Sequence, residues 1–285
     1  MRPLIDRSLH TGWQLREVDP ALGEAALWAS DGPAADWLPA TVPGTVYQDL
    51  IAQGRIPDPF IGRNEAEVQW VADRDWAYRL DFDLAEADRR TAMALVFDGL
   101  DTFAQVWLNG ECVRVSDNMF VPARVDVSQR LRVGSNRLCI RFDSALRRGR
   151  ALEAHHGRRP LWNGDASRLY VRKAPYHYGW DWGPTLLTAG PWKPVRLEAS
   201  DLRVAELDST VWLADDFAQA RVDVRSTLDG DVHGAVLRHR LRDAAGALVA
   251  EVQAPAAQAQ SMSLPIAQPQ LWWPVGHGAQ PLYTL

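Results

Sequence analysis

The sequence has little cysteine, little histidine and no long apolar run. Its two cysteines, Cys112 and Cys139, are too few for a disulfide scaffold and fit no zinc-ribbon spacing. Because each lies in an alternating apolar run, we expect two small buried side chains in a reducing compartment, with a bridge as the alternative if neighbouring strands hold them. The seven histidines include no HExxH-type pair, so we expect no metal site and no cofactor.

The sequence has only a small excess of negative over positive charge. Lysine and arginine number 31, aspartate and glutamate number 36, and the net charge of −5 comes without a basic block. This balance argues against nucleic acid and anionic membranes as partners. No run approaches the ~18 apolar residues of a membrane helix, and residues 1–13 are too polar for a secretion signal, so we expect a cytoplasmic protein.

Tryptophan, by contrast, is abundant. The sequence has 13 tryptophans against 7 phenylalanines and 6 tyrosines. So many tryptophans are typical of a β-rich core, and equally of a site that stacks flat ligands such as sugar rings. Composition alone does not separate these two interpretations.

Apolar residues alternate with a period of two along most of residues 1–200, which is the pattern of half-buried β-strands. Asn109-Gly110, between two such runs, supplies the positive φ angles of a tight hairpin turn. The predicted strands cover 77–84, 91–97, 103–108, 111–115 and 136–142. Because no βαβ alternation is present, residues 1–200 are predicted to form an all-β, antiparallel jelly-roll (galactose-binding-like) sandwich.

One helix is predicted near the N-terminus. Thr45 and Gln48 have the spacing of a capping box, and Gly54 follows as a stop signal. The predicted apolar stripe of this helix comprises Val46, Leu50 and Ile51. Residues 146–168 are dense in arginine and glycine, and we interpret them as the most loop-like stretch of the chain.

After residue 200 the sequence shows short strands separated by turns. Strands are predicted at 209–213, 220–225, 235–241 and 248–252. This spacing is typical of a small immunoglobulin-like β-sandwich, so residues 201–285 are predicted to be a second domain. Residues 254–270 are interpreted as an exposed loop or a strand edge. Residues 283–285 look like the start of a strand, and we therefore expect this domain to be incomplete.

The most informative stretch is Gly-Trp-Asp-Trp-Gly-Pro at residues 179–184. Glycine allows a sharp bend and proline fixes the chain after it, so a stiff loop should present Asp181 between Trp180 and Trp182. Sugars complement such a loop, because their hydroxyls donate to a carboxylate and their C–H faces pack on aromatic rings. The alternative is a structural turn with buried tryptophans and an aspartate that bonds to backbone amides.

An ordered set of motifs covers nearly the whole chain. The motifs lie at 43–46, 57–65, 69–71, 75–78, 97–102, 106–110, 118–120, 179–184, 190–195, 271–274 and 276–285. This ordered set resembles the N-terminal part of the β-mannosidases of glycoside hydrolase family 2, and the 179–184 motif favours mannosidases over the galactosidases and glucuronidases of that family. Pro191 departs from the bulkier apolar residue that is usual there.

The resemblance implies a retaining exo-hydrolase of terminal β-mannosides or manno-oligosaccharides, with a jelly-roll domain, an immunoglobulin-like domain and a TIM barrel. In this family both catalytic glutamates belong to the barrel, the C-terminal partner domain that this sequence lacks. We therefore expect no catalytic residue here and an inert chain in isolation. The resemblance makes Asp181 an acceptor for substrate hydroxyls, with Trp180 and Trp182 beside it. Asn64 either leans toward the same pocket or serves only as a turn residue.

The other polar residues have structural interpretations. Asp98, Asp101 and Asp117 lie near strand ends and are predicted to cap turns. Tyr176 and His177 are predicted to support the Trp-Asp-Trp loop from behind. Two other functions stay open, namely a stand-alone carbohydrate-binding module and a family 2 hydrolase of another β-glycoside.

Overall fold

A computed structural model describes residues 2–18 and 37–285. The chain divides into two compact units, Ile5–Ala199 and a second unit in which the N-terminal residues join Ser200–Leu285. These first residues, assigned on sequence to the 1–200 domain, thus group with the second unit, where Arg2 donates to Asp201 at 2.9 Å. No helix in the described part of the chain is long and apolar enough to cross a membrane.

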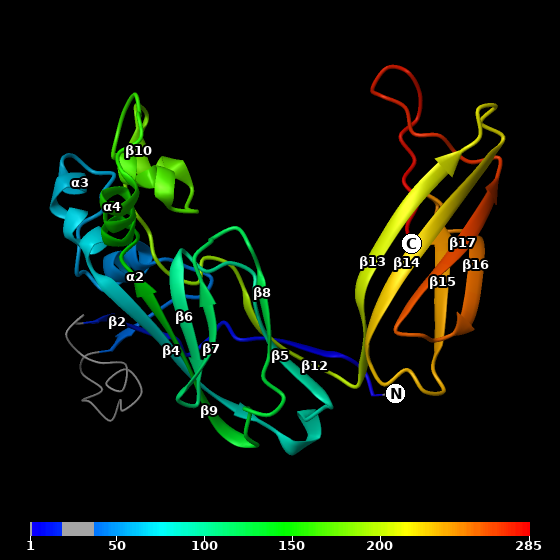
Figure 1. Ribbon diagram of the computed structural model, residues 1–285, viewed down its shortest axis with the longest axis horizontal. Helices are drawn as coiled ribbons and strands as arrows, with labels where there is room; N and C mark the ends of the chain where they lie inside the picture. The colour runs from blue at the N-terminus through cyan, green and yellow to red at the C-terminus, as the bar shows by residue number, and fades with distance from the viewer. Residues whose placement is uncertain (1, 19–36) are drawn as a thin grey trace. The chain divides into compact units, whose positions relative to one another are not determined.

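The larger unit is built from two antiparallel sheets (Figure 1). The six-stranded sheet has the order β3-β2-β4-β9-β6-β7, and the four-stranded sheet has the order β1-β12-β5-β8. Apolar side chains of both sheets pack in one core, in which Tyr78, Leu95 and Phe142 are fully buried. The strands predicted for this unit are confirmed. The five predicted strands are β4 Asp75–Leu84, β5 Ala92–Phe97, β6 Phe103–Leu108, β7 Glu111–Ser116 and β9 Gly134–Asp143. The structure adds five strands that were not predicted: β1 Ile5–Ser8, β2 Gln14–Val18, β3 Leu38–Pro39, β8 Ala123–Asp126 and β12 Val195–Ser200.

The hairpin turn between β6 and β7 is confirmed, since Asn109 and Gly110 have φ angles of 52° and 91°. Both cysteines are free thiols, so the alternative of a bridge between them is wrong. Cys139 is buried in the interior strand β9, as predicted, but Cys112 is exposed. The physical reason is that β7 is the edge strand of its sheet and most of its side chains remain open to solvent.

Helix α2, Val46–Ala52, confirms the predicted helix and its capping box. Val46 and Leu50 of the predicted apolar stripe are buried, but Ile51 is exposed. Residue 51 follows Val46 by five positions and therefore lies about 140° around the helix from it. The buried face includes Asp49 in its place.

The buried carboxylate of Asp49 makes the stability of this unit depend on pH. It accepts hydrogen bonds from Thr41 N at 2.8 Å and Tyr78 Oη at 3.1 Å, yet burial raises its pKa from the usual 3.8 to about 6. Between these values the unfolded chain releases the proton before the native chain does, so stability falls as pH rises. We expect Asp49→Asn, a neutral group of the same shape, to remove this slope from urea-unfolding midpoints measured across the range. Parallel profiles of variant and wild type would contradict this assignment.

The loop predicted for residues 146–168 is wrong over residues 146–156, because α4 spans Ala145–His156, whereas residues 157–165 form neither a helix nor a strand. Ser144 caps the helix by accepting from the Arg147 N–H at 3.1 Å, and Gly157 ends it with a φ of 86°. Alanine, leucine and arginine are strong helix formers, and together they outweigh one internal glycine. Short 3₁₀ segments complete the unit: η2 Gln69–Asp73, η3 Glu86–Asp88, η4 Ala166–Tyr170 and η5 Pro175–His177.

That internal glycine, Gly149, lies on the buried face of α4. A Cβ atom there would lie 2.9 Å from Val171 Cγ2 and 3.2 Å from the Ser167 carbonyl oxygen. Alanine usually stabilises a helix by ~1 kcal/mol relative to glycine, whereas overpacking costs about 1–3 kcal/mol. We therefore expect Gly149→Ala to lower the free energy of unfolding in urea by about 1 kcal/mol. Gly183→Ala is the control with little change, since its Cβ meets nothing within 4 Å. A stabilised Gly149→Ala variant would refute the packing argument.

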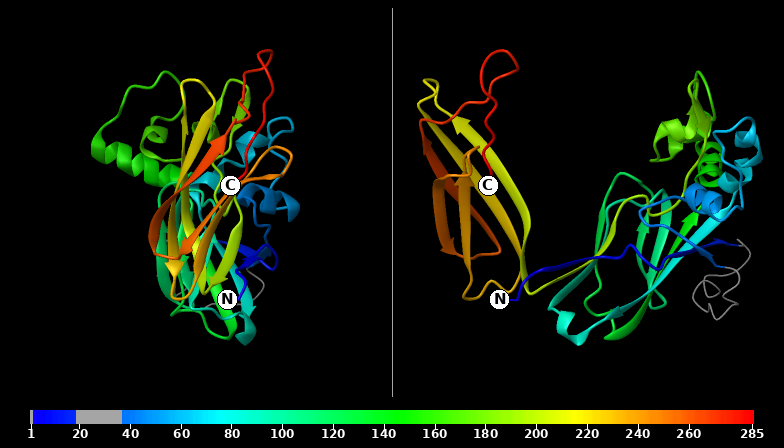
Figure 2. Two further views of the ribbon diagram at one scale, coloured as in Figure 1. Left: turned by 90° about the vertical axis from the view of Figure 1, so that its right-hand side faces the viewer. Right: turned by 180° about the vertical axis from the view of Figure 1, so that it is seen from behind.

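The second unit has two smaller antiparallel sheets, seen from behind in Figure 2. One has the order β13-β14-β17 and the other pairs β15 with β16. Val224, Leu241 and Leu264 belong to its buried core. The strands predicted for this unit are confirmed, and residues 254–270 contain the edge strand β17. The strands are β13 Leu202–Leu213, β14 Gln219–Gly230, β15 Val236–Arg242, β16 Leu248–Pro255 and β17 Ala259–Ala267.

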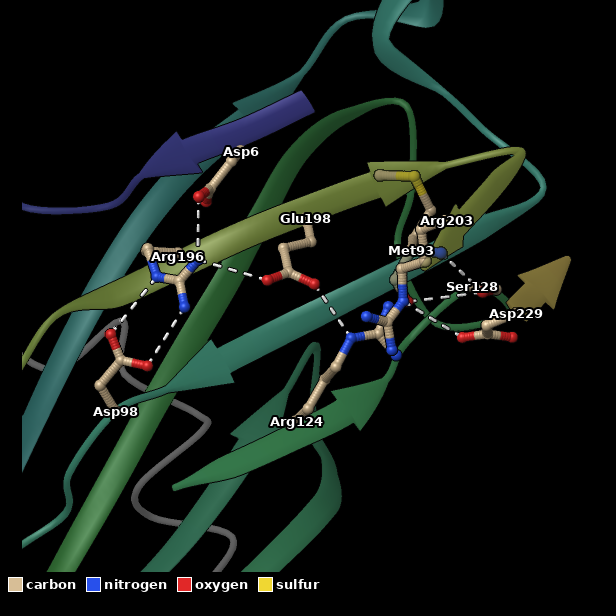
Figure 3. Close-up of polar contacts among 9 residues, drawn as sticks. All are labelled: Asp6, Met93, Asp98, Arg124, Ser128, Arg196, Glu198, Arg203 and Asp229. Carbon is tan, nitrogen blue, oxygen red and sulfur yellow. Dashed lines mark hydrogen bonds and ion pairs between the residues drawn. The ribbon is translucent and has the colours of Figure 1, made fainter. Parts of the chain in front are cut away.

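A network of ion pairs surrounds Arg196 on the four-stranded sheet of the larger unit (Figure 3). Its guanidinium donates to Asp98 at 3.2 Å, to Asp6 at 2.9 Å and to Glu198 at 3.3 Å. Arg124 on β8 donates to the other oxygen of Glu198 at 3.0 Å. The network links β1, β12 and β8, although exposed pairs contribute only ~0–1 kcal/mol each. Asp98, predicted to cap a turn, pairs with Arg196 across the sheet.

Candidate functional site

The Gly-Trp-Asp-Trp-Gly-Pro motif forms a hairpin at the end of the larger unit where the helices gather (Figure 1). Strand β10, Tyr178–Trp180, pairs with β11, Gly183–Thr185, which leaves Asp181 and Trp182 at the tip. Gly179 has a φ of 87°, and a Cβ atom there would lie 2.3 Å from a threonine hydroxyl on β11. Only glycine fits this position, and the bend is therefore fixed by the sequence.

A cleft of about 590 Å³ opens beside this hairpin. Trp182 is 80% exposed, and the exposed Asp181 carboxylate has no hydrogen bond or ion pair to any residue in 2–18 or 37–285. The alternative of a structural turn with buried tryptophans and an amide-bonded aspartate is therefore wrong. Three segments line the cleft: Pro59, Phe60, Gly62 and Glu65; Asn163 and Gly164; and the hairpin residues 178–185.

Three tryptophan rings are in contact at this cleft. Trp180 meets Trp162 edge-on with centroids 5.5 Å apart, and its centroid lies 5.4 Å from that of Trp182. The guanidinium carbon of the buried Arg168 lies 5.5 Å from the Trp180 ring centroid, and Arg168 also donates to Asn163 Oδ1 at 3.2 Å. Arg168 thereby holds the hairpin ring and the facing loop together. Sequence reasoning missed Trp162 and Arg168, because neither lies in the motif.

Helix α3, Asn64–Glu67, braces β11 from one side. Glu65 Oε1 accepts from the Thr185 N–H at 2.7 Å. Gln69 Nε2 donates to the Thr185 carbonyl at 2.8 Å and to the Glu65 carbonyl at 2.9 Å. Both backbone groups of Thr185 are thus held by side chains of one segment, which fixes the position of the hairpin.

Asn64, predicted either to lean toward the pocket or to serve as a turn residue, lies beside this brace. Its Nδ2 donates to the Asp58 carbonyl at 2.9 Å, and within the described chain the cleft is lined by its neighbour Glu65 in its place. This geometry favours the turn alternative for Asn64. One oxygen of the Glu65 carboxylate accepts from the Thr185 N–H, whereas the Asp181 carboxylate has no hydrogen-bond partner among the described residues.

A buried polar cluster lies behind the hairpin. Lys173 and Asp101, whose side chains are inaccessible to solvent, form an ion pair. Lys173 Nζ also donates to Thr188 O at 2.8 Å and to Thr188 Oγ1 at 3.1 Å. Burial lowers the pKa of Lys173, and the charge of Asp101 opposes this effect. The prediction that Asp101 caps a turn is wrong, because its carboxylate is the counter-ion of a buried lysine. Asp117, for which the same role was predicted, is exposed.

His177 adjoins this cluster, with Nδ1 3.4 Å from Thr188 Oγ1. Burial, followed by the charge of Lys173, lowers the pKa of His177 to about 4, so its ring is neutral at neutral pH. Its position behind the loop agrees with the predicted supporting role. Tyr176 packs edge-on against the His177 ring at 4.6 Å but is itself 63% exposed, so it contributes less to this support.

The chemistry of the site is that of a binding surface. Within residues 2–18 and 37–285, no group of three or more histidine, cysteine, aspartate or glutamate side chains could hold a metal ion. The cleft offers one open carboxylate beside exposed aromatic rings. Such an arrangement accepts hydrogen bonds from hydroxyl groups and packs against apolar ring faces.

These features define a galactose-binding-like β-sandwich with an aromatic-flanked carboxylate at the edge of a cleft. The model of the family described as glycosyl hydrolase 2 galactose-binding domain-like matches residues 13–193. The chain belongs to this glycosyl hydrolase 2 family. Membership confirms the predicted resemblance and the galactose-binding-like, all-β fold of the larger unit.

The chain is also similar to β-mannosidases along its whole length. It is 40% identical to Beta-mannosidase B of Thermothelomyces thermophilus, covering 100% of this chain and 32% of that protein. It is 42% identical to Beta-mannosidase B of Emericella nidulans, covering 87% of this chain and 30% of that protein. The crystal structure of Beta-D-Mannosidase from Dictyoglomus thermophilum matches with a TM-score of 0.77 and 29% identity, covering 99% of this chain and 34% of that one. The chain thus spans about a third of the length of these relatives.

Proposed function

We propose that this chain is the N-terminal, non-catalytic portion of a retaining exo-β-mannosidase that removes terminal β-mannose residues. The observation that carries the proposal is the open Asp181 carboxylate beside exposed tryptophan rings, in a chain that is similar to β-mannosidases along its length. Because the chain spans about a third of those relatives, we assign bond cleavage to a catalytic barrel in the remainder of the protein.

In this proposal the hairpin recognises the sugar and does not cleave it. Asp181 accepts hydrogen bonds from hydroxyls of the terminal mannose, while Trp180 and Trp182 pack against the C–H groups of the ring. Retaining hydrolysis needs two carboxyl groups about 5 Å apart, one to protonate the leaving oxygen and one to attack the anomeric carbon. Glu65, the other carboxylate of the cleft, supports the hairpin by accepting from the Thr185 N–H through Oε1, and we assign the reacting pair to the barrel.

Hydrolysis of an aryl β-mannoside tests the proposal. We expect the longer protein, extended through its barrel, to release the aryl alcohol, and the 285-residue chain alone to release none. An aryl β-galactoside and an aryl β-glucosaminide are the comparison substrates for the alternative of another β-glycoside. A folded but inactive extended protein, or one that prefers a comparison substrate, would overturn the assignment.

A second candidate function, a stand-alone carbohydrate-binding module, is favoured by one observation. The described part of this chain by itself forms a cleft, and the exposed Trp182 lines it. Calorimetric titration of the 285-residue chain with mannose and manno-oligosaccharides separates the candidates. We expect little or no binding, because one hairpin supplies only part of a pocket; micromolar binding would favour the module.

A further inference from the structure

We infer that the cluster formed by the buried Lys173 and Asp101 with the half-buried Thr188 is a positioning device that sets the orientation of the hairpin β10–β11 and hence of Asp181. The inference deepens the proposed function, on which its kinetic test rests. It makes these three residues positioning residues, since they act on the ligand only through the hairpin. Its structural test is independent of any activity.

Lys173 joins the two stems of the hairpin, which are the segments before β10 and after β11, to the carboxylate of Asp101. Lys173 precedes β10 in the chain, whereas Thr188 follows β11. An ammonium group has three donors, and here all three have acceptors: an Asp101 carboxylate oxygen, the Thr188 carbonyl at 2.8 Å and Thr188 Oγ1 at 3.1 Å. One buried cation thus fixes the chain before the hairpin and the chain after it relative to each other.

Asp101, the carboxylate in this cluster, is itself fixed to the sandwich. Its backbone N–H donates to the Gly190 carbonyl at 3.0 Å, and the Gly190 N–H donates back to the Asp101 carbonyl at 3.1 Å. Thr102 donates its hydroxyl hydrogen to the other carboxylate oxygen of Asp101. The cluster therefore links the hairpin to the segment of the sandwich that connects β5 with β6.

Thr188 is the branch point of the cluster. Its hydroxyl has one hydrogen, which it donates to Asp101 Oδ2 at 2.5 Å, so it can only accept from its other neighbours. These are Lys173 Nζ and His177 Nδ1, the latter at 3.4 Å. The His177 carbonyl in turn accepts from the Leu186 N–H at 3.0 Å. Both ends of the hairpin thus meet at one hydroxyl.

The buried ion pair of Lys173 with Asp101 is better suited to orienting the hairpin than to stabilising the fold. A buried ion pair is often no more stabilising than apolar side chains of the same volume, because its desolvation cost offsets the attraction. Apolar packing, however, has no direction, whereas four hydrogen bonds converging on Thr188 define the angle at which the stems leave the sandwich. This angle sets the position of the hairpin tip, and therefore of Asp181.

Amide hydrogen exchange on Thr188→Val tests the device without any substrate. Valine keeps the shape and removes the hydroxyl. We expect the amides of Thr185 and Leu186 to exchange about ten-fold faster, with no change in β4 and β9. Thr188→Ser restores the hydroxyl and should return exchange to within about two-fold of wild type. The matched control is Thr227→Val in the second unit, which loses a 3.1 Å bond to Glu206 and should leave the hairpin amides unchanged.

The kinetic test uses the longer glycosidase, well below its melting temperature. We expect Thr188→Val to lower kcat/KM for an aryl β-mannoside about ten-fold and Thr188→Ser to restore it to within about two-fold. Unchanged hairpin exchange in a Thr188→Val protein with a lowered melting temperature would overturn the inference, as would valine and serine variants that behave alike. If the longer protein has no mannosidase activity, only the proposed function is refuted. The positioning role is still tested by the hydrogen-exchange experiment.

Discussion

Replacing Asp181 with alanine in the longer glycosidase is expected to lower kcat/KM for a terminal β-mannoside about 100-fold, or ~2.7 kcal/mol. The carboxylate is exposed in the cleft and has no partner within the described residues, so its hydrogen-bonding capacity is available to substrate hydroxyls. Hydrogen bonds to a charged group contribute ~1.5–3 kcal/mol, which sets the size of the loss. Steady-state kinetics on an aryl β-mannoside measures it.

Two further variants separate recognition from folding in this experiment. Asp181→Asn keeps an acceptor oxygen but loses the charge, so we expect a smaller loss than with alanine. Asp117→Ala removes another exposed aspartate of the same unit and should leave kcat/KM unchanged. Far-ultraviolet circular dichroism confirms that each variant is folded. An Asp181→Ala enzyme with wild-type kcat and KM would remove this residue from the sugar site.

The hairpin and most strands could be predicted because their information is local. In the 179–184 motif, the glycines, the proline and the Asp181 that they present are contiguous, so the bend follows from the residue types alone. The period-two runs identify strands such as β4 and β9 in the same way, since alternation is a property of one short segment. The chemistry at the hairpin tip was therefore accessible from the sequence.

The supports of the hairpin were not accessible, because they join distant parts of the chain. The bond from Thr185 to Glu65 spans 120 positions, and the pair of Lys173 with Asp101 spans 72. No local pattern signals such a partner. Helix α4 was missed for another reason: its arginines were interpreted as marks of a loop, although arginine favours helices.

Lys173→Met is expected to lower the free energy of unfolding of the larger unit by ~3–5 kcal/mol. Methionine replaces the apolar stem of the lysine but leaves the Asp101 carboxylate buried without its counter-ion. An isolated buried carboxylate has a raised pKa, so the native variant retains a proton that the unfolded chain releases. The loss should therefore grow as pH rises above the ordinary range for aspartate and shrink in acid, which urea unfolding at several pH values measures.

The double variant Lys173→Met with Asp101→Asn shows whether this loss comes from the unpaired charge. Asparagine keeps the shape of Asp101 and bears no charge, so we expect the double variant to be more stable at neutral pH than Lys173→Met alone. The exposed pair of Arg137 with Asp81, at 2.7 Å, provides the control, and Arg137→Met should cost only ~0–1 kcal/mol. If the stability lost by the double variant equals the sum of the losses measured for Lys173→Met and Asp101→Asn separately, the buried pair has no coupling energy. In that case the destabilisation of Lys173→Met must come from lost packing.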